Sequence, residues 1–97
     1  MLPVVSHPEA EEELEAAARW YEERLPGLGD DFLDDFEKTL RRILAAPDRW
    51  PFIRGNNRKL NFDRFPYAAI YSVENDRLSV KAVMNLHRRP FYWKHRQ

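Results

Sequence analysis

The chain has 97 residues, with 16 acidic and 16 basic side chains and no cysteine. Without cysteine, neither a disulfide nor a thiolate zinc site can support the fold. No apolar run approaches the ~20 residues of a membrane span, and the first residues lack the apolar core of a signal peptide. We therefore expect one domain over residues 1–97, located in the cytoplasm, that buries roughly 60–65% of its unfolded surface.

The net charge of zero conceals a division between the two halves of the chain. Residues 1–48 hold 13 acidic and 5 basic side chains, a net charge of −8, whereas residues 49–97 hold 3 acidic and 11 basic ones, a net charge of +8. One interpretation is a solvated acidic helix surface joined to an ordinary basic sheet. The other is a dipolar molecule whose second half binds an anion, either nucleic acid or an acidic partner peptide.

The first predicted elements are a short strand over residues 2–6 and a helix over residues 8–25. Ser6 and Glu9 have the spacing of a capping box, and Pro8 is tolerated in the first turn because its missing N–H would be unpaired there. Acidic side chains fill the outer side of this helix, and the sequence Pro-Gly-Leu-Gly ends it. The residues that recur at helical spacing on the inner side are Leu14, Ala17, Ala18, Tyr21 and Leu25.

A second helix is predicted from an Asp30 cap to about residue 46, with Pro47 just beyond its end. The short connection between two long helices predicts an antiparallel helical hairpin. Its apolar stripe is most simply interpreted as core, and consists of Phe32, Leu33, Phe36, Leu40, Ile43 and Leu44.

Strands follow the helices. Residues 48–57 are expected to form a loop, and a strand near residues 58–63 is expected to point Leu60 and Phe62 inward. Residues 65–85 then predict a β-hairpin with Asn75-Asp76 as its two-residue turn, because both residues tolerate positive φ. This turn sets a register with one apolar face: Val73 with Leu78, Tyr71 with Val80, Ala69 with Ala82, and Tyr67 with Met84. The other face is mostly polar: Glu74 with Arg77, Ser72 with Ser79, and Ile70 with Lys81.

The element order predicts an α+β fold: a short N-terminal strand, a long antiparallel helical hairpin and then a three-stranded antiparallel meander. The helical hairpin is expected to cover one face of an antiparallel sheet. No helix is predicted for the tail, residues 87–97, because it is short and interrupted by a proline.

Five residues near the end of the hairpin are the main candidates for a binding site: His87, Arg88, Arg89, Tyr92 and Trp93. Two guanidinium groups can hold a phosphate, an aromatic ring can stack on a base, and an imidazole can move a proton. A structural interpretation is a solvated strand end with Trp93 packed under the sheet. Positive charges this close repel each other, so an anionic partner would relieve an electrostatic cost.

Two further cations, Arg64 and Lys59, can extend this basic surface across neighbouring strands, although each alone is an ordinary surface charge. Tyr67 and Tyr71 share the apolar face of the hairpin and are interpreted as core. No metal or other cofactor is expected, because the three histidines lack the spacing of metal ligands and no glycine-rich phosphate loop or nucleophile elbow is present.

The chain also carries a set of short motifs in a characteristic order. They are His7-Pro8-Glu9-Ala10 opening an acidic helix that ends in Tyr21-Glu22-Glu23, Phe32 and Phe36 in the second helix, Arg64-Phe65-Pro66-Tyr67 with Tyr71, and Ala82-Val83 with His87-Arg88-Arg89-Pro90 and Tyr92-Trp93. With these motifs the chain resembles, over nearly all of its length, the RelE/ParE superfamily. Members of this superfamily are the toxins of type II toxin–antitoxin (plasmid stabilisation) pairs, so the resemblance implies the fold predicted above.

The resemblance implies two different activities. RelE-like members cut mRNA on the ribosome with several Lys and Arg residues and a C-terminal Tyr. In this chain, Ala68 stands where those members typically have Arg, Asn61 stands where a second Lys is usual, and Arg88 matches the basic position after the last strand. ParE-like members instead inhibit DNA gyrase without any known nuclease site.

The leading hypothesis from the sequence is therefore a ParE-like toxin that arrests growth by binding DNA gyrase. The first alternative is a metal-independent RelE-like mRNA interferase that acts on mRNA at the ribosome. In that alternative, the residues that bind and polarise the phosphate are Arg88, Lys59, Arg64 and Tyr92. The second alternative is a degenerate toxin retained only as a binding partner.

The resemblance also implies a cognate antitoxin, whose acidic or apolar tail orders as it docks on this domain. The basic residues of the sheet and a groove beside the helical hairpin are the expected docking surfaces. Direct binding of duplex DNA is less expected, because both long helices are acidic. The candidate target-binding residues are Arg64, His87, Arg88, Arg89, Tyr92 and Trp93.

Overall fold

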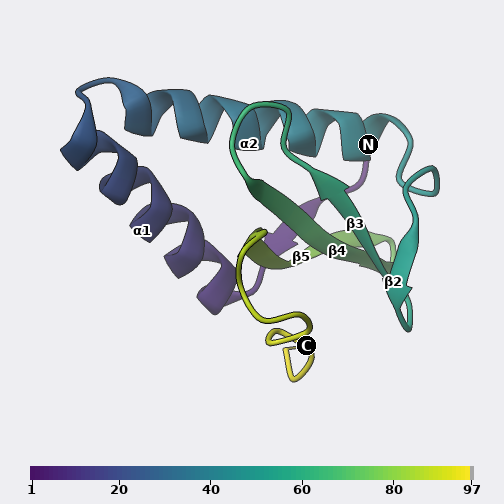
Figure 1. Cartoon of the computed structure of the whole chain (residues 1–97). Helices are drawn as coiled ribbons and strands as arrows, with labels where there is room; N and C mark the ends of the chain where they lie inside the picture. Colours follow the sequence, from purple (N-terminus) through teal and green to yellow (C-terminus); the bar gives the residue numbers. More distant parts are fainter. Residues whose placement is uncertain (97) are drawn as a thin grey trace.

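A five-stranded sheet with the order β1-β5-β4-β3-β2 packs against two long helices in this computed structural model, which describes residues 1–96 (Figure 1). β1 pairs in parallel with β5, and the other neighbours are antiparallel. The predicted α+β fold is confirmed, with β1 lying beside the last strand of the chain. The elements are β1 (Val4–Ser6), α1 (Pro8–Arg24), α2 (Leu28–Ala45), β2 (Phe52–Arg54), β3 (Asn57–Asn61), β4 (Tyr67–Glu74) and β5 (Arg77–Asn85).

The start of α1 differs from the predicted capping box. Ser6 is the last residue of β1, where it pairs with Val80, so its side chain does not cap the helix. His7 is the N-cap instead, and its Nδ1 atom accepts a 3.1 Å hydrogen bond from the backbone N–H of Glu9. The parallel pairing of β1 therefore overrides the local capping signal.

The turn between the helices is held by Glu22, whose carboxylate accepts hydrogen bonds from the N–H groups of Gly27 and Gly29 at 3.0–3.1 Å. Gly27 is the N-cap of α2 with φ 92°, so α2 begins before the predicted Asp30 cap. Leu25 lies at this turn and is 58% exposed, so the prediction that it faces the core is wrong. The helix has already ended at that position and no longer points its side chains at the sheet.

The turn of the hairpin is confirmed, since Asn75 and Asp76 have φ 52° and 59°. The predicted register holds from Glu74↔Arg77 to Tyr71↔Val80 and then fails at a β-bulge. Beyond the bulge, the observed pairs are Ile70↔Ala82, Ala69↔Val83, Ala68↔Met84 and Tyr67↔Asn85. The predicted pairs Ile70 with Lys81, Ala69 with Ala82, and Tyr67 with Met84 are therefore wrong.

The bulge has a packing reason. Val80 and Val83 both belong to the core beneath the helices, and strict alternation would place residues three apart on opposite faces. Lys81 is the residue left over in the register, and its side chain is 7% exposed beside Glu74. The bulge turns the end of β5 so that Val83 and Asn85 face α1, where the candidate site lies.

β2 was not predicted and lies within the expected loop at residues 48–57. It has only three residues, of which Phe52 is 57% exposed, so no alternation of apolar residues marks it. The predicted inward positions Leu60 and Phe62 are both buried, although β3 already ends at Asn61. β2 adds an edge strand to the predicted meander.

The sheet has a core on each face. The larger core lies beneath α1 and α2 and contains Phe32, Ile43, Tyr71 and Val80 among its buried members. The smaller core lies on the opposite face, where Trp93 from the C-terminal tail packs with Ala68, Ile70, Ala82 and Met84. Packing against both faces explains why β4 and β5 are buried along most of their length.

Candidate functional site

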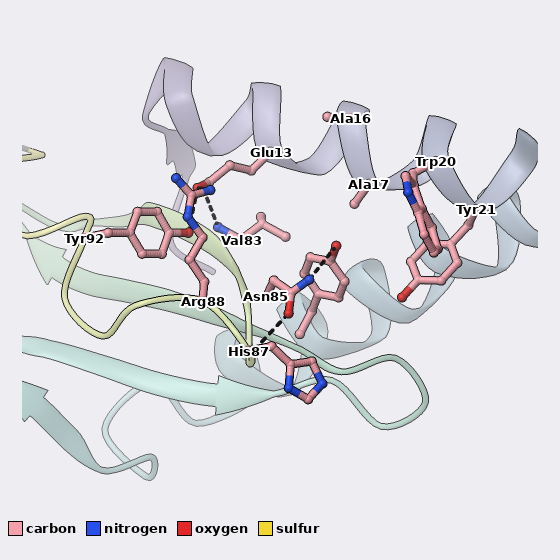
Figure 2. A pocket seen from close by; sticks show the side chains of 11 residues that line it. Glu13, Ala16, Ala17, Trp20, Tyr21, Val83, Asn85, His87, Arg88 and Tyr92 are labelled. Carbon is pink, nitrogen blue, oxygen red and sulfur yellow. Dashed lines mark hydrogen bonds and ion pairs between the residues drawn. The ribbon is translucent and has the colours of Figure 1, made fainter.

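A groove of about 580 Å³ lies between α1, the end of β5 and the C-terminal tail (Figure 2). α1 meets α2 at their connecting turn, and the tail passes the opposite end of α1 (Figure 1). The floor of the groove is apolar and is formed by Ala16 and Ala17 of α1 and Val83 of β5. The groove is open because two consecutive alanines carry too little side chain to fill the space between the helix and the strand.

One side of the groove is aromatic. Tyr21 and Tyr67 line it and pack against the larger core from its edge, so both are only partly buried. Tyr71 is fully buried, as predicted. Trp20 stands at the rim with 49% of its surface exposed, and the guanidinium carbon of Arg24 lies 3.3 Å from its ring centre. Tryptophan is enriched among the residues that contribute most to protein–protein binding, so Trp20 is a candidate docking anchor.

The other side of the groove is basic. The guanidinium carbon of Arg88 lies 4.2 Å from the ring centre of Tyr92, and its side chain is 56% exposed. The nearest carboxylate is that of Glu13, at 3.9 Å. His87 also lines the groove, and its backbone N–H donates to Oδ1 of Asn85 at 2.9 Å. Arg88 is therefore fixed by a ring and only loosely neutralised, so it remains available to an anionic partner.

Glu13 organises this basic side and was missed by the sequence analysis. Its two carboxylate oxygens accept hydrogen bonds from the N–H of Val83 at 3.1 Å, the hydroxyl of Tyr92 at 2.6 Å and the guanidinium of Arg96 at 2.8 and 3.2 Å. Arg96 has a side chain only 5% exposed and also donates to Glu9 at 2.8 Å. This network fastens the C-terminal tail to α1.

One signal in the sequence points to Glu13. It lies three residues after the buried Ala10 and four before the buried Ala17, so it falls on the inward stripe of α1 rather than on the solvated face. A carboxylate on an inward stripe needs a buried partner. Arg96, its partner, lies 83 residues away in sequence.

The environment of Tyr92 determines what its hydroxyl group can do. Burial, together with the hydrogen bond to Glu13 and the charge of Glu13, raises the pKa of Tyr92 well above its usual value of 10. The phenol therefore stays protonated and is committed as a donor to a carboxylate. It is unsuited to act as a phenolate base or to release a proton to a substrate.

The remaining candidate residues lie elsewhere. Trp93 is 1% exposed in the smaller core, which fits its structural interpretation and leaves its ring unavailable for stacking on a base. Arg64 forms a 3.1 Å ion pair with Asp31 near the start of α2, and Lys59 is paired with Ile70 on β4. Arg89 is exposed at the surface beside Arg88. The structure thus brings His87, Arg88 and Tyr92 together at the groove but not Arg64, Lys59 or Trp93.

Neither a cluster of metal ligands nor a membrane-spanning helix occurs within residues 1–96. No group of three histidine, aspartate or glutamate side chains there is placed to hold a metal ion. In the same range, neither helix is long and apolar enough to cross a membrane.

Residues 4–89 match the model of a protein family described as the ParE toxin of the type II toxin–antitoxin system, parDE. The chain belongs to the ParE toxin family. Its structure is similar to a chain of the solved chromosomal ParDE toxin–antitoxin system from P. aeruginosa, with a TM-score of 0.78 and 15% sequence identity over 90% of this chain and 98% of that one. No curated protein sequence gives a significant match. The ParE-like fold and the role of a toxin in such a system follow from the family membership.

Proposed function

We propose that this ParE-family toxin arrests growth in the cytoplasm by binding and inhibiting DNA gyrase, and that a cognate antitoxin neutralises it. The observation that carries the proposal is the form of the groove: an apolar floor, an aromatic anchor and one loosely neutralised guanidinium. These are features of a surface that binds a protein.

The polar groups at the groove favour binding over catalysis. The hydroxyl of Tyr92 and the guanidinium of Arg96 are both held by Glu13, so neither is free to act on a phosphate. The interferase alternative needs Arg88, Lys59, Arg64 and Tyr92 around one phosphate, and the groove contains only Arg88 and Tyr92. The geometry therefore supports the gyrase hypothesis better than mRNA cleavage.

The antitoxin segment expected in this groove is an apolar one flanked by acidic residues. Apolar side chains would cover Ala16, Ala17 and Val83, and a carboxylate would reach Arg88. The segment would order as it binds, which is typical of a chain that is disordered when free.

A pair of tryptophan substitutions on α1 tests the docking site. Ala16→Trp fills the groove, whereas Glu12→Trp adds the same ring at an exposed position outside the residues that line it. We expect Ala16→Trp to weaken binding of the antitoxin encoded beside the toxin at least ~10-fold, which corresponds to about 1.4 kcal/mol. Equal affinities for the two variants would place the antitoxin elsewhere.

Pulse labelling after induction of the toxin alone tests the target. An early fall in DNA synthesis, before protein synthesis declines, is the expected result for a gyrase inhibitor. An early fall in protein synthesis would favour the interferase alternative, and unchanged growth would favour a degenerate toxin.

A further inference from the structure

A second basic surface lies at the other end of the molecule, outside the groove. The first half of α2 is acidic, but its second half carries Lys38, Arg41 and Arg42. Their spacing of three and four residues places them on one side of the helix, where they line a shallow hollow of about 370 Å³ with Ala45 and Asp63. All three are exposed. Both long helices are acidic overall, as the sequence analysis states, but the second half of α2 is not.

One arginine from the following segment joins this row. The guanidinium carbons of Arg42 and Arg49 lie 5.1 and 5.0 Å from the ring centre of Trp50, which holds them in place without neutralising their charge. The side chain of Arg58 is only 17% exposed, and its guanidinium donates to the carbonyls of Asp48 and Trp50 at 3.0 and 2.7 Å, so it is not counted with the row. We call Lys38, Arg41, Arg42 and Arg49 the α2–β2 basic surface.

The carboxylates that contact this surface are too few to neutralise it. Asp63 pairs with Arg42 at 3.0 Å. Lys38, Arg41 and Arg49 form no ion pair within residues 1–96. Three of the four cations therefore have no contacting carboxylate in this range. Cations arranged in this way attract a polyanion.

The chemistry of the surface favours duplex DNA over single-stranded RNA. A protein that binds single strands offers open aromatic rings on which unpaired bases stack. Here Trp50 is half-buried beside two guanidinium groups. Phe52 is 57% exposed, but Arg58 lies over its ring and it does not line the hollow. The contacts that the row itself offers are with phosphates, and duplex DNA carries about one charge per 1.7 Å of its axis. The row from Lys38 to Arg42 extends about 6 Å along the helix, enough to follow neighbouring phosphates.

We propose that the α2–β2 basic surface binds the phosphate backbone of duplex DNA. It lies over the second half of α2 and the connection that leads to β2, away from the C-terminal tail that forms one side of the groove (Figure 1). The protein can therefore contact DNA and hold a protein partner in the groove at the same time. This inference is independent of the identity of that partner.

The test is fluorescence anisotropy of a labelled duplex of mixed sequence, titrated with the full-length toxin between about 50 and 200 mM salt. Three to four phosphate contacts predict a slope of about −3 for the logarithm of the affinity against the logarithm of the salt concentration. The double variant Lys38→Gln, Arg41→Gln should reduce the magnitude of this slope by about 2. Both positions are exposed, and circular dichroism verifies that the variant is folded.

Two matched controls make the result specific. Arg19→Gln with Arg24→Gln removes two exposed cations from α1 and should leave the slope unchanged. Arg88→Gln with Arg89→Gln removes two cations near the groove and should also leave it unchanged. The proposal is overturned if Arg88→Gln with Arg89→Gln reduces the slope and Lys38→Gln with Arg41→Gln does not. It is also overturned if the duplex does not bind at the lowest salt, or if single-stranded RNA with the same number of phosphates binds more tightly.

Discussion

The hydroxyl group of Tyr92 donates a 2.6 Å hydrogen bond to Oε2 of Glu13, and this bond joins the C-terminal tail to α1 across 79 positions of sequence. The same carboxylate accepts hydrogen bonds from Arg96, so one glutamate holds the tail at two points after Arg88. The orientation of Arg88 above the Tyr92 ring therefore depends on a residue of α1. This network stabilises the tail and removes the tyrosine from proton-transfer chemistry.

Removing Glu13 should be strongly destabilising. Glu13→Ala leaves the guanidinium of Arg96, which is 5% exposed, without its main partner, although Glu9 still contacts it. Breaking a buried pair by removing one member costs about 3–5 kcal/mol. We expect a loss near the lower figure in the free energy of unfolding, measured with urea. The control Glu12→Ala, at an exposed position, should change it by less than about 0.5 kcal/mol. Equal effects would contradict the proposed role of Glu13.

Tyr92→Phe distinguishes a toxin that acts by binding its target from one that acts by cleaving RNA. The substitution keeps the ring beneath Arg88 and removes only the hydroxyl. We expect a stability loss of about 1.5–3 kcal/mol, because the lost hydrogen bond is to a charged group. Growth arrest at a temperature where the variant is folded should persist, because a gyrase inhibitor that acts by binding needs no phenol. Complete loss of toxicity in a folded Tyr92→Phe variant would favour a catalytic role.

The affinity for the antitoxin should depend on salt through Arg88. This side chain is the loosely neutralised cation of the groove, so Arg88→Gln should weaken antitoxin binding and flatten its salt dependence. Isothermal titration at two salt concentrations measures both effects. The matched control is Arg89→Gln, at an exposed position next to Arg88 and outside the residues that line the groove. A salt dependence unchanged by Arg88→Gln would mean that apolar contacts dominate.

The free energy of unfolding should fall at high pH because the hydroxyl group of Tyr71 ionises more readily in the unfolded state. Its hydroxyl donates to the carbonyl of Pro47 at 2.7 Å, and burial raises its pKa from 10 to about 12. Because the pKa of Tyr71 is higher in the folded state than in the unfolded state, its contribution to the free energy of unfolding is fully present below pH 10. This contribution is lost as the pH rises from 10 toward 12. The slope from one such tyrosine is at most about 1.4 kcal/mol per pH unit.

Urea unfolding at several pH values between 9 and 12 measures this dependence. Tyr71→Phe should have a lower starting stability and a shallower decline above pH 10. Identical slopes in the wild type and the variant would show that other groups cause the alkaline loss.

Local patterns predicted the elements more accurately than their packing. The hairpin turn was predictable because Asn75 and Asp76 both accept positive φ and alternation surrounds them. The bulge at Lys81 was not, because it arises from Val80 and Val83 both packing beneath the helices. A capping signal at Ser6 was equally misleading, since pairing with β5 determines the conformation of that residue.

The candidate site was predicted in part. Because His87, Arg88 and Tyr92 are close in the sequence of the basic tail, they were predicted to lie together. The structure brings all three to the groove. Glu13 was not recognised because α1 is rich in glutamate, and its place on the inward stripe becomes clear only once Ala10 is seen to be buried as well as Ala17. Burial of Trp93 was an open alternative, since an aromatic residue in a basic tail fits either a core or a binding surface.

Plasmid supercoiling by purified gyrase tests directly whether the toxin inhibits this enzyme by binding it. The toxin should inhibit supercoiling in a dose-dependent manner, Tyr92→Phe should inhibit it as well as the wild type, and the antitoxin should restore activity. Undisturbed supercoiling, together with ribosome-dependent cuts in mRNA by the same protein preparation, would rule out gyrase as the target.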